Sequence, residues 1–202
     1  MLNILLVDYD FYHRKGLSTL IYNQLAKKGK ERVCFLLPSQ NDNQGVADII
    51  FRNDMVTIYI EDKNKRCTTA ETLEQSPGKI TIHVPFTLRN QPLNVVSQKI
   101  KKIVEIASSD YRELANKEDV CWRLGLKQHT QLSDTENHVM VMIGHGYDSN
   151  HISKIMKRSK KTISTHYRNA SRKIGMSNRA EFYRFASFIA SCRREERNTI
   201  CL

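Results

Sequence analysis

Basic and hydroxyl-bearing side chains gather in the last quarter of this 202-residue sequence. Ten bases face one acid, Glu181, in the stretch 154–184, and these bases are Lys154, Lys157, Arg158, Lys160, Lys161, Arg168, Arg172, Lys173, Arg179 and Arg184. Ammonium and guanidinium groups bind phosphate oxygens, and hydroxyls and guanidinium groups donate hydrogen bonds to base edges. The chain as a whole carries a formal charge of +11. A solvated helix face can also be this basic, so the spacing of the residues has to decide between the two interpretations.

The spacing favours two helices joined by a short break. Asp148 or Ser149 is positioned to cap a first helix that ends near Met156. After the break Lys157-Arg158-Ser159, the serine caps a second helix that runs from about Lys160 to Ile174 and ends at Gly175. Two helices joined by such a break, with a polar and basic second helix, are typical of a helix-turn-helix that reads DNA.

DNA recognition predicts a role for the polar side chains of the second helix. We expect Lys160, Lys161 and Arg172 to bind phosphates, together with the first N–H groups of the helix. Short hydroxyls and one long guanidinium can reach base edges in the major groove from the outer face. The candidate DNA-binding residues are Ser159, Lys160, Lys161, Thr162, Ser164, Thr165, Tyr167, Arg168 and Arg172.

These two helices belong to a predicted four-helix bundle. Ser133 and Glu136 have the spacing of a capping box and open the first helix. Ser177 or Asn178 opens the fourth, whose apolar stripe of Phe182, Phe185, Ala186 and Ile189 we interpret as core. The sequence therefore predicts a compact all-α unit over residues 131–196, followed by a tail over residues 197–202.

Residues 132–182 resemble the LuxR-type (FixJ/NarL) helix-turn-helix family. The matching positions are Leu132, Ser133, Glu136, Gly146, Ile152, Ile155, Ser159, Thr162, Ile163, Ser164, His166, Asn169, Lys173, Ile174, Gly175 and Arg179. The resemblance implies base and backbone contacts at Ser164, Thr165 and Arg168. Two positions depart from the family pattern, with Thr135 in place of an arginine and His151 in place of a glutamate. The run from Arg158 to Ser164 is especially similar to the RcsB/RcsA branch.

The first hundred residues alternate short β-branched runs with helical patterns. Strands are predicted over 3–7, 32–37, 55–61 and 79–84, and helices over 12–28, 45–53, 69–75 and 93–107. This alternation predicts an α/β unit, a parallel sheet with flanking helices, over residues 1–108. Residues 109–130 are polar and mixed, and we interpret them as a linker that holds at most a short helix.

Proteins of the LuxR-type family often carry a phosphoacceptor receiver domain in this position, and the opening strand and helix are similar to one. Receiver chemistry needs adjacent acids, an acceptor aspartate after the third strand and a lysine after the fifth. Asp8 and Asp10 flank Tyr9 here, and Pro85-Phe86-Thr87 stands where the lysine is expected. We therefore predict a degenerate acidic pocket formed by Asp8, Asp10 and Asn53, with the acids capping the next helix.

The strand register leaves three positions for the acceptor. A third strand over 48–51 puts Asn53 there, a third strand over 32–37 puts Pro38 or Ser39 there, and one over 55–60 puts Glu61 or Asp62 there. The second register is favoured because it leaves a helical stretch before each later strand, although it implies that one strand-helix unit has been lost.

Without a working pocket, protein contact is the remaining use of the N-terminal unit. Receivers commonly dimerise through their last strands and last helix, so the resemblance makes Val96, Ile100 and Ile103 dimerisation candidates. The sequence is interpreted as a dimeric, phosphorylation-independent transcription regulator that binds a promoter site on double-stranded DNA, similar to the RcsB/RcsA/EcpR/GadE group. Two alternatives are a conventional phosphorylation-switched response regulator and an auxiliary protein that mainly heterodimerises with a related regulator.

Other classes of function lack a sequence signature. There is no nucleotide-binding or nucleophile-elbow motif, so neither an enzyme activity nor a cofactor is expected. His138, His145, His151 and His166 fall on different helix faces, which argues against a metal site. Five scattered cysteines without a C-x-x-C pair suit reduced thiols. No apolar run has the length of a membrane span and the N-terminus is unlike a signal peptide, so we expect a cytoplasmic protein.

Overall fold

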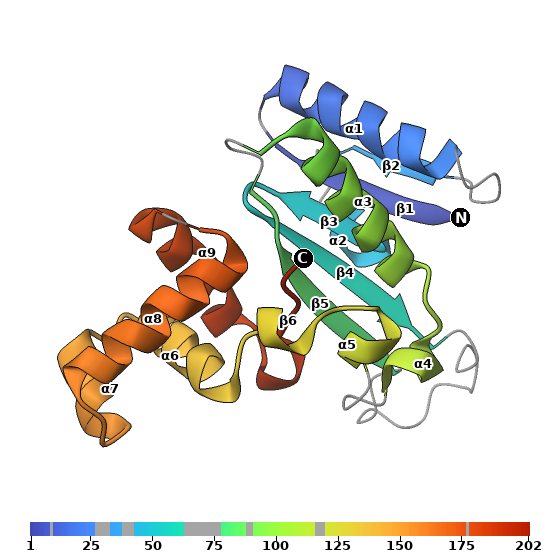
Figure 1. Cartoon of the computed structure of the whole chain (residues 1–202). Helices are drawn as coiled ribbons and strands as arrows, with labels where there is room; N and C mark the ends of the chain where they lie inside the picture. Colours follow the sequence, from blue (N-terminus) through green and yellow to red (C-terminus); the bar gives the residue numbers. More distant parts are fainter. Residues whose placement is uncertain are drawn as a thin grey trace.

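A mixed sheet with helices and a separate group of helices make up the structure, a computed structural model (Figure 1). It describes residues 1–8, 10–26, 33–37, 43–62, 78–87, 91–115, 120–176 and 178–202. The predicted helix over 69–75 lies outside these ranges, as do Pro38, Ser39 and Cys67. The other four cysteines are free thiols. Within the described ranges, no helix combines the length and the apolar character that a bilayer span requires.

The described strands form one six-stranded sheet in the order β2-β1-β3-β4-β5-β6. Their bounds are β1 Leu2–Val7, β2 Val33–Leu36, β3 Ile49–Arg52, β4 Met55–Glu61, β5 Lys79–Pro85 and β6 Asn198–Thr199. Parallel pairs join β1 to β2, β1 to β3 and β5 to β6, whereas β4 is antiparallel to both neighbours. The parallel sheet predicted from the sequence is therefore a mixed sheet in which β4 runs against the other described strands. The order of its first five strands is nonetheless the flavodoxin-like order 2-1-3-4-5.

Strand β3 corrects two predictions. The segment 45–53 was predicted as a helix, but only α2, Asn43–Val46, is helical, and residues 49–52 form a strand. Ile49, Ile50 and Phe51 are buried, with Ile49 and Ile50 in the cores on opposite faces of the sheet, so β-branched and aromatic side chains fit a central strand there. The favoured register, with 32–37 as the third strand, is also wrong, because that segment is β2 at the sheet edge. The alternative that places Asn53 after the third strand is the one observed.

One face of the sheet is covered by α1, Phe11–Ala26, and α3, Leu93–Ala107, which pack against each other (Figure 1). Leu17, Ile21 and Leu25 of α1 join the core on this face. Val96, Ile100 and Ile103 of α3 were predicted as dimerisation candidates, but their exposed fractions are 5%, 0% and 0%. They belong to the core between the sheet and its covering helices, because the apolar stripe of α3 packs on α1 and the sheet. They therefore present no surface to a partner in this structure.

The predicted linker packs on the same core. It contains the short helices α4, Tyr111–Ala115, and α5, Val120–Arg123, and the 3-10 turn η2, Gln128–Thr130. Leu114 and Leu124 are buried against the sheet core, so these two leucines anchor a segment that is otherwise mostly polar. The connection between the two parts of the chain is thus held on the sheet.

The four predicted bundle helices are present as α6, Asp134–Gly144, α7, Ser149–Ile155, α8, Lys160–Ile174, and α9, Arg179–Ser191. Ser133 and Glu136 form the predicted capping box, and Asp148, Ser159 and Asn178 cap α7, α8 and α9. Gly175 ends α8 in the left-handed region with φ 70°, as a residue after a helix C-terminus often does. The predicted α9 stripe is core: Phe182, Phe185, Ala186 and Ile189 are all buried.

The C-terminal segment returns from the bundle to the sheet. After η3, Arg194–Glu196, the chain forms β6 and pairs with β5 (Figure 1). Ile200 is buried in the sheet core and Cys201 in the bundle core. The segment 197–202, predicted as a tail, therefore includes a strand of the sheet and residues of both cores.

Glu136, Lys173 and Gln131 tie the bundle together. Lys173 Nζ lies 2.7 Å from Glu136 Oε2 and donates to the Gln131 carbonyl at 2.8 Å. The Gln131 side chain in turn donates to the Cys201 carbonyl and accepts from the Cys201 N–H, both at 2.9 Å. This network joins α6, α8 and the C-terminal segment.

Gly144 sets the distance between α6 and α9. A Cβ at this position would lie 2.1 Å from the Ala186 carbonyl oxygen, which belongs to the backbone of α9. We expect Gly144→Ala to lower the free energy of unfolding by about 1–3 kcal/mol, because the two helices must move apart. Gly16→Ala on α1 is the matched control, since nothing lies within 4 Å of its Cβ position. It should be neutral or stabilising by up to about 1 kcal/mol. Urea unfolding compares the two, and equal effects would contradict the assigned close contact.

The pair Glu136 and Lys173 predicts a pH-dependent contribution to stability. Burial alone would raise the pKa of Glu136, but hydrogen bonds from Lys173 and Ser133 outweigh it and hold the pKa below its usual value. Glu136→Gln keeps an acceptor for the capping box but leaves Lys173 without its carboxylate partner. We expect it to lower the free energy of unfolding by about 1–3 kcal/mol at neutral pH.

The sign of the pH dependence follows from the lowered pKa. Glu136 contributes stability above its unfolded pKa and loses that contribution as the pH falls through its folded pKa. The difference in the free energy of unfolding between the wild type and Glu136→Gln, measured by urea titration, should therefore become smaller as the pH is lowered. Asp134→Asn, at an exposed acid in the same helical turn, is the control and should cost less. A difference that stays constant with pH would argue against the ionic contribution.

Candidate nucleic-acid interface

Helix α8 presents one continuous polar face to solvent. Lys161, Thr165, Arg168 and Arg172 follow the spacing i, i+4, i+7 and i+11, which places them on a single face, and all four are exposed. The opposite side is anchored by Ile163, Ala170 and Ile174, which are buried in the bundle. The core residues thus fix the orientation of this face, which we name the α8 face.

The beginning of α8 is fixed by its cap and by the turn before it. The Ser159 hydroxyl accepts the Thr162 N–H at 3.1 Å and also contacts the Thr162 hydroxyl at 2.9 Å. Lys157 takes a left-handed conformation with φ 51°, which ends α7 and directs the chain into α8. Ser159, Thr162 and Lys160 therefore lie where the first N–H groups of α8 point, although the Ser159 hydroxyl is already used as the cap.

Ser164 and Tyr167 lie at the side of the α8 face. Ser164 is half-buried, and the Tyr167 ring packs edge-on against Phe182 with 4.8 Å between ring centroids. Tyr167 was predicted on the outer face, but this packing gives it a role in the bundle core. Thr165 is exposed and donates its hydroxyl to the Lys161 carbonyl at 3.0 Å.

A groove of about 510 Å³ borders this side of α8. Ser164 and Arg168 form one wall, the turn between α6 and α7 with Tyr147 forms another, and the start of α9 with Arg179 and Tyr183 forms the third. Tyr147, Arg179 and Tyr183 were absent from the predicted site. These residues lie outside α8, so the spacing within that helix did not point to them. The packing of α9 and of the turn between α6 and α7 brings them beside α8.

The basic residues of the stretch 154–184 divide into two sets. Lys173 binds Glu136 inside the bundle, and Arg184, although exposed, pairs at 2.9 Å with Asp54 in the turn between β3 and β4. The other eight are exposed: Lys154, Lys157, Arg158, Lys160, Lys161, Arg168, Arg172 and Arg179. Most of the local charge surplus is therefore on the surface around α8, where a polyanion can reach it.

The predicted acidic pocket at the end of β1 is nearly closed. Asp8 and Asn53 line a cavity of about 10 Å³ together with His13 and Arg14. Asp8 contacts the His13 ring and accepts the Asp10 N–H at 2.9 Å. Asp10 does not line the cavity, because its carboxylate accepts the His13 N–H at the start of α1, as predicted for a helix-capping acid.

Aromatic packing occupies the place where a receiver lysine is expected. Phe86 is fully buried and packs edge-on against Phe51, with 5.4 Å between ring centroids. Both rings line the same small cavity as Asp8 and Asn53. Asn53 has φ 48° and belongs to the two-residue turn between β3 and β4. The Asn53 amide and the two rings supply neither an acceptor carboxylate nor a lysine at these positions, and the cation that lines the cavity is Arg14 of α1.

Comparisons with known proteins bear on the bundle above all. Residues 130–186 match the GerE family model, described as bacterial regulatory proteins of the luxR family. No curated protein matches the sequence. Among solved structures, the RcsB response regulator of Salmonella typhimurium aligns at 14% identity and a TM-score of 0.29, over 93% of this chain and 100% of that chain. The match begins at the last residue of η2 and spans α6, α7, α8 and most of α9, and residues 130–186 are thus a LuxR-family helix-turn-helix domain.

Proposed function

We propose that this protein is a sequence-specific transcription regulator that binds promoter DNA as a dimer, without phosphorylation. The observation that carries the proposal is the exposed α8 face, which has the basic and hydroxyl side chains of a recognition helix and lies within the LuxR-family match. Residues 1–108 serve as a receiver-like regulatory unit, 109–130 as a linker and 131–196 as the DNA-binding unit. The protein acts in the cytoplasm, with no enzyme activity.

The geometry suits a helix in the major groove. An α-helix with its side chains is about 10–12 Å across, and the groove is about 12 Å wide. In such a complex Thr165 and Arg168 face the base edges, with Ser164 beside them. Lys160, Lys161 and Arg172 contact phosphates, and these contacts make the affinity depend on salt.

The N-terminal pocket supports a role without phosphorylation. An acyl phosphate needs a carboxylate nucleophile and charges that neutralise it. The position after β3 holds the Asn53 amide, the rings of Phe51 and Phe86 fill the neighbouring space, and Asp8 is engaged by His13. The unit then serves to hold the DNA-binding domain and to contact another protein.

Dimerisation follows from the way helix-turn-helix proteins bind DNA. Dimers place two recognition helices in successive major-groove turns and read two half-sites about 34–36 Å apart. The partner is a second copy of this chain or a related LuxR-type regulator. Because Val96, Ile100 and Ile103 are buried, the contact uses other surfaces.

Arg168 should determine sequence choice. Genome-wide binding of the tagged protein first identifies the preferred site. Arg168→Ala should then weaken binding to that site by about 1–3 kcal/mol and bring it closer to binding of a scrambled duplex. Lys160→Ala is the control and should weaken both duplexes about equally, since it removes only a phosphate contact. Titration by fluorescence anisotropy measures both affinities. If Arg168→Ala leaves the ratio of the affinities for the preferred and scrambled duplexes unchanged, the α8 face is not the surface that reads the bases.

Acetyl phosphate should leave the protein unmodified and its DNA affinity unchanged. Incubation with acetyl phosphate and Mg²⁺, followed by intact-mass and peptide mass spectrometry, tests this, with a conventional receiver as the positive control. One stable acyl phosphate on an Asp or Glu within residues 1–108, accompanied by a change in affinity, would establish the conventional response regulator instead. A mobility shift seen only after adding a related regulator would favour the heterodimerising alternative.

A further inference from the structure

The groove beside α8 has the chemistry of a phosphate-binding surface. It contains two guanidinium groups, from Arg168 and Arg179, and the rings of Tyr147 and Tyr183. Tyr147 and Tyr183 are 46% and 47% exposed, and Arg179 is exposed as well. Its acid, Asp148, is already engaged as the cap of α7, where it accepts the N–H groups of Asn150 and His151 at 2.8 Å. The groove thus offers cations and hydroxyl donors to an anion.

The position of the groove relative to the α8 face identifies the anion. Ser164 and Arg168 border the groove and also belong to the surface that meets the bases under the proposed function. A recognition helix nearly fills the width of the major groove, so the two phosphate backbones run along its two sides. The side of α8 that carries Ser164 is the side on which the groove opens. A DNA backbone beside α8 therefore passes over Tyr147, Arg179 and Tyr183.

We propose that Tyr147, Arg179 and Tyr183 bind the phosphate backbone of one DNA strand, beside α8 and outside the helix-turn-helix itself. We call this second DNA-contact surface the docking edge. This inference rests on the proposed function, because it assumes that α8 enters the major groove. Arg179 supplies the charge, and the two tyrosine hydroxyls donate hydrogen bonds to phosphate oxygens. Contacts of this kind position a protein on the duplex and carry no direct sequence information.

The three side chains reach one backbone from two different helices. Tyr147 lies just before α7, whereas Arg179 and Tyr183 lie in the first turns of α9, one turn apart. The rings of Tyr167 and Phe182, packed edge-on, form part of the groove lining beneath them. The edge is thus held by core packing, and its orientation to the α8 face is fixed before DNA arrives.

Arg179→Ala and the double variant Tyr147→Phe/Tyr183→Phe separate charge from hydrogen bonding. Arg179→Ala should weaken binding equally for the preferred and a scrambled duplex, and should make the plot of log K against log[salt] shallower by about 0.9, the value for one phosphate contact. The double variant should weaken both duplexes roughly two- to tenfold for each hydroxyl that is lost. Its salt slope should stay at the wild-type value, because a hydroxyl releases no counterion.

Arg112→Ala is the matched control, since it removes the same charge from exposed Arg112 on α4, far from α8 in Figure 1. Thermal melting checks that each variant is folded, and the measurements use the full chain. If the wild type binds DNA in a salt-dependent manner and Arg179→Ala keeps the wild-type affinity and salt slope, the docking edge is overturned. A loss of affinity confined to the preferred duplex would also overturn it. If the wild type itself does not bind duplex DNA, the proposed function fails first, and the two failures are therefore distinguishable.

Discussion

The backbone pairing of the C-terminal segment holds the two parts of the molecule together. Ile200 N–H donates to the His83 carbonyl at 2.9 Å and the Asn198 side chain to the Thr81 carbonyl at 3.0 Å, which fixes the segment to β5. On its other side, the Gln131 amide satisfies both backbone groups of Cys201. Because the segment is bound from both sides, its position determines how the helical bundle lies against the sheet.

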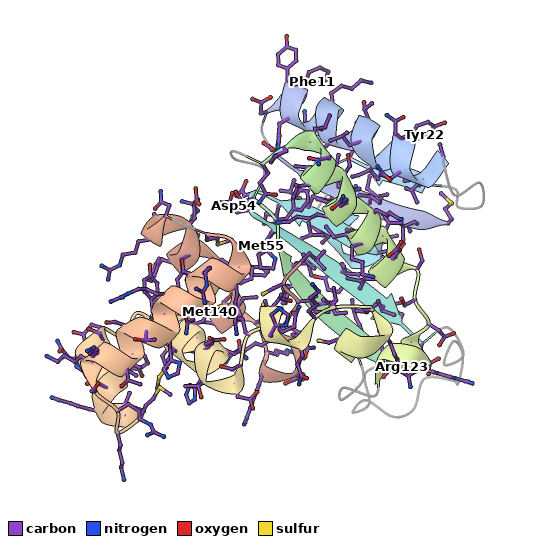
Figure 2. All side chains as sticks on the ribbon, in the orientation of Figure 1. Phe11, Tyr22, Asp54, Met55, Arg123 and Met140 are labelled. Atoms are coloured by element: carbon purple, nitrogen blue, oxygen red, sulfur yellow. The ribbon has the colours of Figure 1, made fainter. Side chains whose placement is uncertain are left out.

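This pairing directs a particular surface of the bundle toward the sheet. The Phe188 ring of α9 packs edge-on against His83 of β5, and Met55 of β4 is buried among residues of α6, α8 and α9. Figure 2 shows Asp54 and Met55 at the part of the sheet nearest the bundle. Burial lowers the pKa of His83 to about 4, so its ring is neutral at pH 7 and suits this apolar contact. The α8 face takes no part in it and stays exposed while the bundle is docked.

Local signals predicted the bundle, whereas the sheet depended on contacts that the sequence does not display. Ser133, Ser159 and Gly175 act within one helical turn, so their roles follow from spacing alone. Strand β3 pairs with the adjacent β4 on one side, but on the other it pairs with β1, 45 residues earlier. The segment around Cys201 bonds to Gln131 and to His83, 70 residues or more away. Neither has a local pattern that requires a strand. The stripe of Val96, Ile100 and Ile103 illustrates the same limit, since periodicity identifies an apolar face but not the surface that covers it.

The positive charge of the bundle serves two physical purposes that composition cannot separate. Lys173 is 19% exposed and its carboxylate partner Glu136 6%, so removing either leaves a poorly solvated charge without its partner. Arg168 and Arg172 lie one turn apart on the same helix, yet they extend from the exposed face, where they stay hydrated at little cost. There they can contact an incoming phosphate and release its counterions. The helical position relative to Ile163, Ala170 and Ile174 makes the difference. A basic residue of α8 is therefore paired within the fold or exposed on the surface according to its angle from the buried stripe, and the charge surplus becomes a candidate DNA-binding surface only once the core has oriented the helix.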